Sequence, residues 1–180
     1  MNKHNVFIVL LVMTLNALVG CSSDLKDYQQ ASPKFELFDY FSGNVKAWGM
    51  VQDYSGKQTR RFEVEIVGSV ENNTLTLVED FVFDDGEIDQ RIWRITRLAD
   101  GRYQGEADDI IGVAEGMELG NALQWRYDFE LQIDGSSLTV SFDDWLYRQD
   151  EKHVFNLTKI KKFGVEVGTI TLFFQRQKNS

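Results

Sequence analysis

Cysteine, proline and histidine are almost missing from this sequence. Its 180 residues include one cysteine, one proline and two histidines. With one cysteine, the chain cannot form an internal disulfide. His153 is the only histidine after the leader, so a multi-histidine zinc site or a nucleophile-histidine-acid triad has no partners here. We therefore expect His153 to be structural or solvated, and we expect no metal site and no cofactor.

Positive charge is scarce as well. Lysine and arginine number 19 against 28 aspartates and glutamates, which gives a formal net charge of −9 at pH 7. Binding to a nucleic acid requires a cationic stripe that neutralises phosphates, and this charge balance does not provide one. The composition therefore argues against nucleic acid as a partner.

Only one long apolar run is present, at the N-terminus. Val6–Val19 is apolar apart from Thr14 and Asn16, and it follows the polar pair Lys3 and His4. A helix needs about 20 apolar residues to cross the hydrocarbon of a bilayer. The shorter run is typical of a secretory signal peptide, and an uncleaved N-terminal anchor is the alternative.

The single cysteine stands directly after this run, in Leu18-Val19-Gly20-Cys21, which resembles a bacterial lipobox. We expect cleavage after residue 20 and acylation of Cys21, and two or more acyl chains give a stable membrane anchor. Ser22 stands where an aspartate would favour the inner membrane, so we expect the periplasmic face of the outer membrane. The predicted parts are a signal peptide at 1–20, the acylated cysteine with a polar tether at 21–33, and one folded domain at 34–180.

The folded domain shows the alternation of β-strands. In 61–67, Phe62, Val64 and Ile66 alternate with polar residues, and 123–133 alternates in the same way. Such period-two runs indicate strands with one apolar and one polar face. Further strands are predicted at 45–52, 74–83, 88–97, 102–109, 111–117, 137–147, 153–161 and 167–176.

Short turns separate these segments, among them Asp84-Asp85-Gly86 and Asp134-Gly135. About eight to ten strands joined by hairpins predict an all-β fold, a single antiparallel up-and-down barrel, because closure removes exposed strand edges. A sandwich is the alternative. Phe35, Phe38 and Phe41 are spaced as on a helix, and we expect a short N-terminal helix that plugs one end of the barrel.

Several short motifs resemble those of a known family. They are 41–53 (FSGNVKAWGMVQD), Leu77–Phe81, Asp85-Gly86, Arg91–Trp93, Gly112, Gly120–Ala122, Phe142–Trp145 and Lys162–Gly164. On these motifs the chain resembles an uncharacterised, domain-of-unknown-function family of proteobacterial lipoproteins, which is expected to be lipocalin-like. The resemblance spans about residues 33–174. It implies a role in envelope lipid, since genes of the family often lie beside enzymes that modify fatty acyl chains, and it implies no catalytic residue.

Two carboxylic acids occupy apolar faces of predicted strands. Glu79 and Asp144 each fall among leucines and phenylalanines of the same strand face, and a buried carboxylate must be paired, hydrogen-bonded or protonated. A bulge that turns one of them outward is one interpretation. Another is a polar pair at the floor of an apolar cavity, which orients a ligand head group or serves as acid and base. A third is that both are satisfied by tyrosines or by interior arginines, the candidates being Arg91, Arg94 and Arg126.

The four tryptophans all fall in predicted strands. A barrel of this size is either filled by its side chains or holds one small ligand, and large aromatic residues fit both arrangements. The sequence leaves this alternative open. The residues predicted to contact a ligand are Glu79, Arg91, Trp93, Trp125, Tyr127 and Asp144.

We therefore expect a monomeric, membrane-anchored periplasmic lipoprotein whose barrel binds a hydrophobic small molecule or lipid, such as a fatty acyl chain, for carriage or homeostasis of envelope lipid. No catalytic residue is assigned, and we favour binding over catalysis. Two alternatives stay open. One is a lipid-modifying hydratase or isomerase that uses paired carboxylates, and the other is a non-catalytic interaction module with a solid core.

Overall fold

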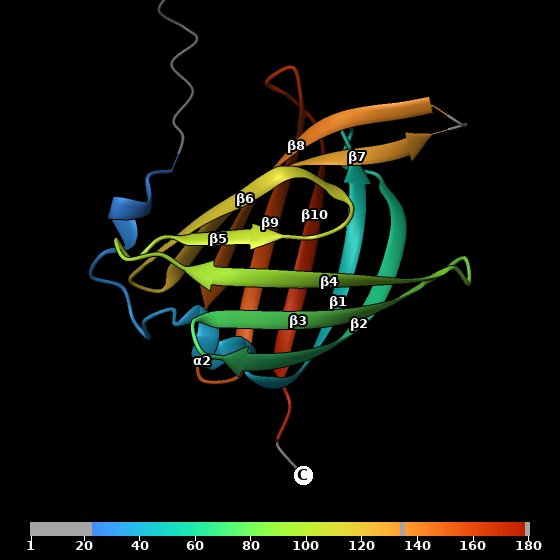
Figure 1. Ribbon diagram of the computed structural model, residues 1–180. Coiled ribbons are helices and arrows are strands. Elements are labelled where there is room, and N and C mark those ends of the chain that lie inside the picture. Colours follow the sequence, from blue (N-terminus) through green and yellow to red (C-terminus); the bar gives the residue numbers. More distant parts are fainter. Residues whose placement is uncertain (1–22, 134–135, 179–180) are drawn as a thin grey trace, which may run out of the picture.

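Strands dominate the computed structural model, which describes residues 23–133 and 136–178. Within these residues each of ten antiparallel strands pairs with the next along the chain, and β1 pairs with β10 (Figure 1). The predicted up-and-down barrel is confirmed, and the sandwich alternative is wrong. The signal peptide and Cys21 lie outside the described residues. The strands are β1 (Gly43–Asp53), β2 (Gln58–Glu71), β3 (Thr74–Phe83), β4 (Ile88–Arg97), β5 (Tyr103–Glu106), β6 (Ile110–Leu119), β7 (Ala122–Ile133), β8 (Ser136–Arg148), β9 (His153–Lys162) and β10 (Val165–Arg176).

Alternation along each strand decides which side chains face the interior. In β2, the buried Phe62, Val64 and Ile66 alternate with the exposed Glu63 and Glu65. Successive residues of a strand point to opposite faces of the sheet, so the wall of the barrel is apolar inside and polar outside. Removal of the apolar face from water contributes about 25 cal/mol per Å² and is the main force that closes the sheet.

Two inward-facing glycines make room for a tryptophan. A Cβ at Gly116 of β6 would lie 2.0 Å from Cε3 of Trp125, and a Cβ at Gly105 of β5 would lie 2.5 Å from Cζ2 of the same indole. Both distances are far inside van der Waals contact, so neither position accepts a larger residue without displacing Trp125. Glycine on these two strands therefore fixes the place of a large aromatic side chain inside the barrel.

A short helix closes one end of the barrel. α2 (Leu37–Phe41) buries Phe41, whose ring meets the Phe174 ring of β10 edge to face with the centroids 5.5 Å apart. The helix approaches β2 so closely that a Cβ at Gly68 would lie 1.7 Å from the Phe41 carbonyl oxygen. The structure thus contains the predicted helical plug, but the helix begins at Leu37, so that Phe35 lies before it.

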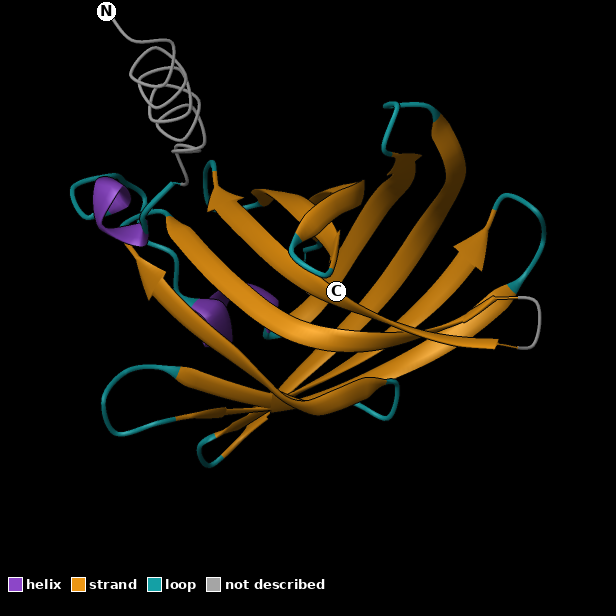
Figure 2. Cartoon of the chain, turned by 90° about the horizontal axis from the view of Figure 1, so that it is seen from above, coloured by secondary structure: helices purple, strands orange, loops and turns teal. Residues whose placement is uncertain are grey.

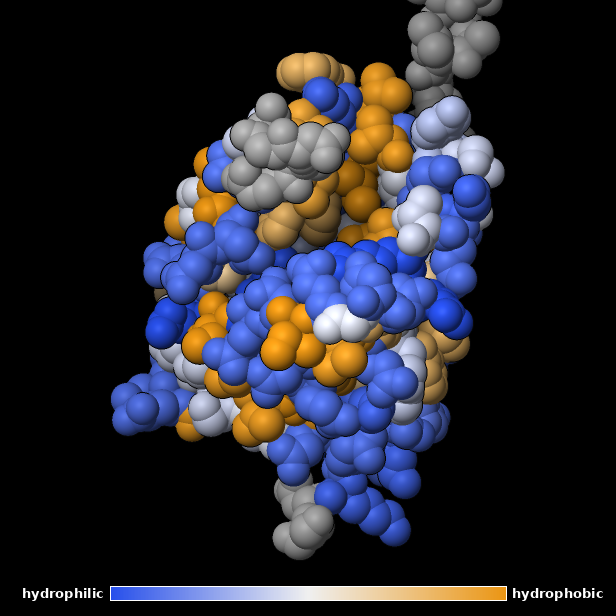
Figure 3. Space-filling view, turned by 90° about the vertical axis from the view of Figure 1, so that its right-hand side faces the viewer, coloured by the Kyte–Doolittle hydropathy of each residue, from blue (hydrophilic) through white to orange (hydrophobic). Residues whose placement is uncertain are grey.

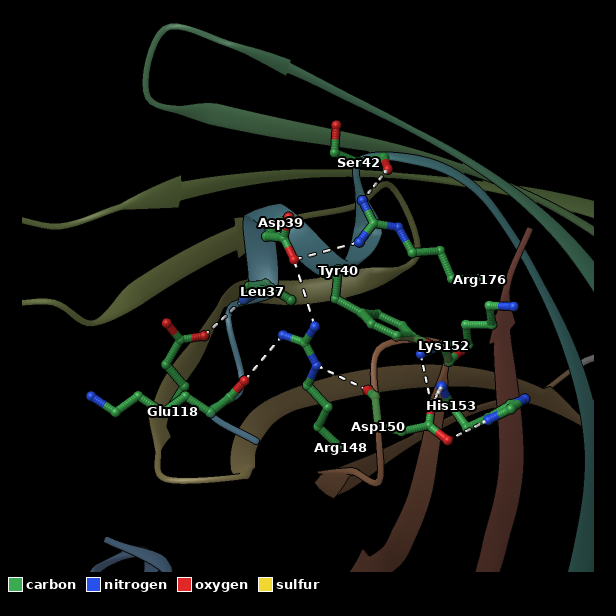
Figure 4. A network of polar contacts seen from close by, with 11 residues as sticks. Leu37, Asp39, Tyr40, Ser42, Glu118, Arg148, Asp150, Lys152, His153 and Arg176 are labelled. Atoms are coloured by element: carbon green, nitrogen blue, oxygen red, sulfur yellow. Dashed lines mark hydrogen bonds and ion pairs between the residues drawn. The ribbon is translucent and has the colours of Figure 1, made fainter. Parts of the chain in front are cut away.

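Polar contacts fix this plug to the ends of the strands (Figure 4). Tyr40 Oη donates to the carbonyl oxygen of Lys152 at 2.8 Å and lies 3.3 Å from that of Phe174. The buried guanidinium of Arg148 donates to the carbonyl oxygen of Lys34 at 3.0 Å, just before α2. Bonds of this kind to backbone carbonyls tie the helix to β8, β10 and the turn between β8 and β9.

A second helical turn packs outside the barrel, near the plugged end. The 3-10 helix η2 (Leu25–Tyr28) buries Leu25 against Ala122 and Trp145, and the rings of Tyr28 and Trp145 are 5.9 Å apart. Figures 1 and 2 show η2 and α2 on the same side of the barrel. Residues 25–28 belong to the expected tether at 21–33, and they are packed rather than extended. Among the described residues, no helix has the length and apolar character needed to span a membrane.

Candidate ligand-binding cavity

The barrel is hollow. A cavity of about 340 Å³ reaches from Leu37 and Phe41 of the plug to Val51 and Phe83 near the β1–β2 and β3–β4 hairpins, and its walls are mainly aliphatic and aromatic. Figure 3 faces the end opposite the plug and shows hydrophobic side chains in a recess bordered by hydrophilic ones. The volume lies within the range of about 300 to 1,000 Å³ typical of small-molecule pockets. The structure therefore decides between a filled and a hollow barrel in favour of the hollow one.

All six residues predicted to contact a ligand line this cavity. The strand alternation could identify them because each shares a face with buried apolar residues. That they bind a ligand stays a prediction. Four strands supply them: Glu79 from β3, Arg91 and Trp93 from β4, Trp125 and Tyr127 from β7, and Asp144 from β8.

Three aromatic side chains form one side of the cavity. The Trp93 ring meets Trp125 and Tyr127 edge to face, with centroids 5.8 and 5.3 Å away, and all three residues are buried. This is a favoured aromatic geometry. The other two tryptophans do not line the cavity: Trp48 is exposed on the outer wall, and Trp145 lies beneath η2.

Arg91 is engaged by an acid outside the predicted set. Its Nε and Nη2 atoms lie 2.8 and 2.6 Å from Oδ2 of Asp109, in the turn between β5 and β6. Its guanidinium also lies 5.2 Å from the centroid of the Phe129 ring. Charge-assisted contacts are stronger than neutral hydrogen bonds, so the Arg91 cation is already committed. No sequence pattern singled out Asp109, because strand periodicity does not extend into a turn.

Glu79 lies opposite Arg91 in the register of β3 and β4, yet its carboxyl makes no hydrogen bond or ion pair with a described residue. The side chain is only half-buried because it faces the cavity, which the barrel encloses on all sides but one. This enclosure raises the pKa of Glu79 to about 7; the Arg91 charge opposes the rise, and those of Asp109 and Asp144 add to it. Glu79 thus presents an unpaired carboxyl that exchanges its proton near neutral pH.

Asp144, on β8, is a buried acid whose charge acts on Glu79. It is 9% exposed, and its Oδ1 atom has no hydrogen-bond partner among the described residues. Burial raises the pKa of Asp144 to about 7, against the lowering effects of Thr158 and Arg91. A buried acceptor without a partner costs roughly 1 to 3 kcal/mol. Asp144 therefore offers a second carboxyl, one oxygen of which has no partner among the described residues.

The other arginines considered as interior partners lie on the outer wall. Arg94 is exposed, and Arg126 is exposed and pairs with Asp143 at 3.3 Å. Each follows an inward-facing tryptophan by one residue, and a shift of one residue along a strand reverses the face. The interpretation that Arg94 or Arg126 neutralises Glu79 or Asp144 is therefore wrong.

One arginine of the cavity, Arg60, lies outside the predicted set. The guanidinium carbon of Arg60, on β2, lies 3.6 Å from the centroid of the Phe83 ring, and Nη2 lies 2.9 Å from Asp85 and 2.5 Å from Glu87. Arg60 lines the cavity at its open end. A signal was present, because Arg60 is two residues before Phe62 and so shares the inward face of β2.

His153 takes no part in the cavity. Its Nδ1 atom is 2.9 Å from Oδ2 of Asp150, and its ring stacks on Phe173 with the centroids 5.5 Å apart. In the described part of the chain, no group of three or more histidine, cysteine, aspartate or glutamate residues could hold a metal ion. The polar groups that line the cavity are carboxyl, guanidinium, hydroxyl and amide groups.

These features define a class of protein. A closed antiparallel meander, plugged at one end by a helix and hollow inside, is a lipocalin-like barrel. The sequence matches the model of the family described as protein of unknown function (DUF3833) over residues 15–176, and the chain belongs to that family.

Among solved structures, the S-type phycobiliprotein lyase CPES from Guillardia theta is similar to this chain. The TM-score is 0.60 at 8% sequence identity, and the match covers 79% of this chain and 92% of that one. At such low identity the similarity concerns the fold alone. No curated protein matches the sequence significantly.

Proposed function

We propose that the barrel binds an apolar ligand, such as a fatty acyl chain or another lipid, in its interior. The observation that carries this proposal is the cavity of about 340 Å³, apolar along its walls and open at one end. Burial of an acyl chain contributes about 0.8 kcal/mol for each methylene group removed from water. The cavity also favours binding over the alternative of an interaction module with a solid core.

We also propose a cellular location for the protein. The lipobox-like sequence that ends at Cys21 supports an acylated N-terminus, with the domain held at the periplasmic face of the outer membrane. A protein tethered there works next to a supply of lipids. Mass spectrometry of the protein extracted from its own membrane tests the anchor, and an unmodified Cys21 would contradict it.

Binding is tested by blocking the cavity. Val51 lines the interior near the opening, so Val51→Trp should fill part of the space that a ligand needs. Val67 is 53% exposed on the outer wall of β2, and Val67→Trp is the matched control. We expect the uncharged fluorescent probe N-phenyl-1-naphthylamine to bind the unmodified chain and Val67→Trp, and to bind Val51→Trp at least about tenfold more weakly, a loss of about 1.4 kcal/mol. Equal binding to both variants, or no binding to the unmodified chain, would refute the proposal.

A second candidate function follows from the two carboxyl groups. Glu79 and Asp144 both have pKa values raised to about 7 by enclosure in the barrel, which is the range that suits a general acid or base at neutral pH. They could thus transfer protons in the hydration or isomerisation of an unsaturated lipid. Incubation with a mixture of unsaturated fatty acids, followed by mass spectrometry, tests this. Turnover that persists in Glu79→Gln and in Asp144→Asn would exclude the carboxyls as catalysts.

A further inference from the structure

The charges that line the cavity are unequal in number. In the described part of the chain they are two guanidinium groups and four carboxyl groups: Arg60, Arg91, Glu79, Glu87, Asp89 and Asp144. Each arginine is also held by a carboxylate outside that lining, Arg91 by Asp109 and Arg60 by Asp85. The positive charges are thus committed within the protein, and the interior carries an excess of acidic groups.

Two of the acids are free to act on a ligand. The Asp144 carboxyl is nine-tenths buried, and its Oδ1 has no hydrogen-bond partner among the residues described. The Glu79 carboxyl faces the same cavity and is bonded to no described side chain. Asn156 and Thr158, which line the cavity on β9, are bonded to each other at 2.8 Å. A hydrogen-bond donor brought in by a ligand would satisfy acceptors that the protein leaves open.

We propose that the ligand is an amphiphile whose polar end is a cationic amine, bound by Glu79 and Asp144, and that the cavity discriminates against a free carboxylate. This inference rests on the proposed function and deepens it by naming the head group. An ammonium group supplies three donors and the charge opposite to that of the acids. The neighbouring aromatic rings of Trp93 and Tyr127 add to the attraction, because aromatic faces favour cations.

A ligand with a carboxylate head group would find no free cation among the described residues of the cavity and would be repelled by its acids. The cation nearest to Glu79 is Arg91, and its Nε and Nη2 already contact Asp109. A carboxylate ligand would therefore have to displace Asp109 or remain unpaired beside two acids of its own sign. Repulsion between like charges is strong in a weakly hydrated interior. An acyl chain would enter this cavity more readily with an amine at its end than as the free acid.

Three probes with the same twelve-carbon chain separate these cases. We expect isothermal titration calorimetry at pH 8, below the critical micelle concentrations, to give the order dodecylamine, then dodecanol, then dodecanoate. The affinity for the amine should exceed that for the carboxylate by at least about tenfold. Glu79→Gln and Asp144→Asn should each remove most of this preference while dodecanol binding changes little. Glu115→Gln, on the exposed outer wall of β6, is the control and should leave the order unchanged.

The outcomes distinguish the inference from the function beneath it. Dodecanoate binding as tightly as dodecylamine would overturn the inference and leave an apolar-ligand barrel in place. An amine preference that survives in both carboxyl variants would also overturn it, because the acids would not be its source. No binding of any of the three probes would remove the proposed function and the inference together.

Discussion

A carboxyl group inside a barrel loses its hydration, and the protein must replace it or leave the acid protonated. Here the two cavity acids receive different surroundings. Glu79 has the Arg91 charge nearby without a bond to it, and Asp144 keeps an open acceptor atom. Both retain protons up to neutral pH as a result. Their proton uptake links the stability of the fold to pH.

Protonation of these two acids should make the fold more stable at low pH than at high pH. The folded-state pKa values of Glu79 and Asp144 are about 7, above the ordinary values of 4.5 and 3.8, so the folded chain holds more protons than the unfolded chain between those limits. The free energy of unfolding should therefore fall as pH rises from about 4 to 8, by roughly 3 to 4 kcal/mol for each group. Glu79→Gln and Asp144→Asn should each flatten this decrease, as measured by urea denaturation at pH 5 and pH 8.

The control for this prediction is again Glu115→Gln, which removes an exposed acid of the outer wall. Its stability should fall with pH as much as that of the unmodified chain. Asp150, whose pKa the neighbouring His153 lowers to about 2, is ionised at both pH values and does not contribute to the difference. A decrease of the same size in all four proteins would show that the cavity acids are not protonated as described.

At the residue scale, the sequence could predict which side chains face inward but not how they pair. Alternation along the strands was enough to select Glu79, Asp144 and Arg91. The partner of Arg91 is Asp109, which is 18 positions further along the chain in a turn. The contact between Asp109 and Arg91 depends on the path of the β5–β6 turn. Neither strand periodicity nor composition predicts that path.

At the scale of single elements, the apolar face of α2 could be predicted from the sequence, but its hydrogen-bond partners could not. The spacing of its phenylalanines predicts an apolar face that plugs the barrel, since apolar residues at such intervals lie on one side of a helix. The bonds that hold the plug come from residues more than a hundred positions away, such as Arg148 and Lys152. A helix this short has little stability of its own, so these distant contacts are what keep it folded.

Removal of one such contact should loosen the plug. Tyr40→Phe deletes the hydroxyl that donates to the Lys152 carbonyl oxygen, which keeps only its bond from the Arg176 N–H. We expect the free energy of unfolding to fall by about 0.5 to 1.5 kcal/mol, measured by urea denaturation. Tyr54→Phe removes the same group from a side chain that is 86% exposed in the β1–β2 hairpin, and it should cost almost nothing. Equal losses in the two variants would contradict the described role of Tyr40.

At the scale of the whole molecule, the closed meander could be predicted because each strand pairs with its neighbour in sequence. Ten predicted strand segments correspond to the ten strands in the described residues, and hairpins leave few ways to arrange them. Whether the interior is hollow could not be predicted. That depends on how the large rings of Trp93 and Trp125 pack against each other and against Gly105 and Gly116, and small shifts in packing decide whether space remains.

Access to the interior should depend on Arg60, which lies over Phe83 at the open end and is tied to Asp85 and Glu87. Arg60→Ala removes these contacts between β2 and the β3–β4 turn at the rim of the opening. Stopped-flow fluorescence should then show N-phenyl-1-naphthylamine entering and leaving roughly threefold to tenfold faster, as expected from the loss of a cation–π contact. Arg61→Ala removes the next residue, which points outward and pairs with Asp84 at 3.1 Å, and is the control. Unchanged rates in Arg60→Ala would place the entrance elsewhere.

The positions of η2 and α2 show that the open end of the barrel lies away from the N-terminal segment. η2 packs beside the plugged end, and the chain enters the fold there (Figures 1 and 2). If the protein is anchored to a membrane through its N-terminal segment, the plugged end of the barrel would face the membrane. The open end would then face the surrounding water. Each methylene group exposed to water costs about 0.8 kcal/mol. An apolar ligand would therefore not pass through the water between the membrane and the open end without assistance. Loading and unloading would require a donor or acceptor that docks face to face with the entrance.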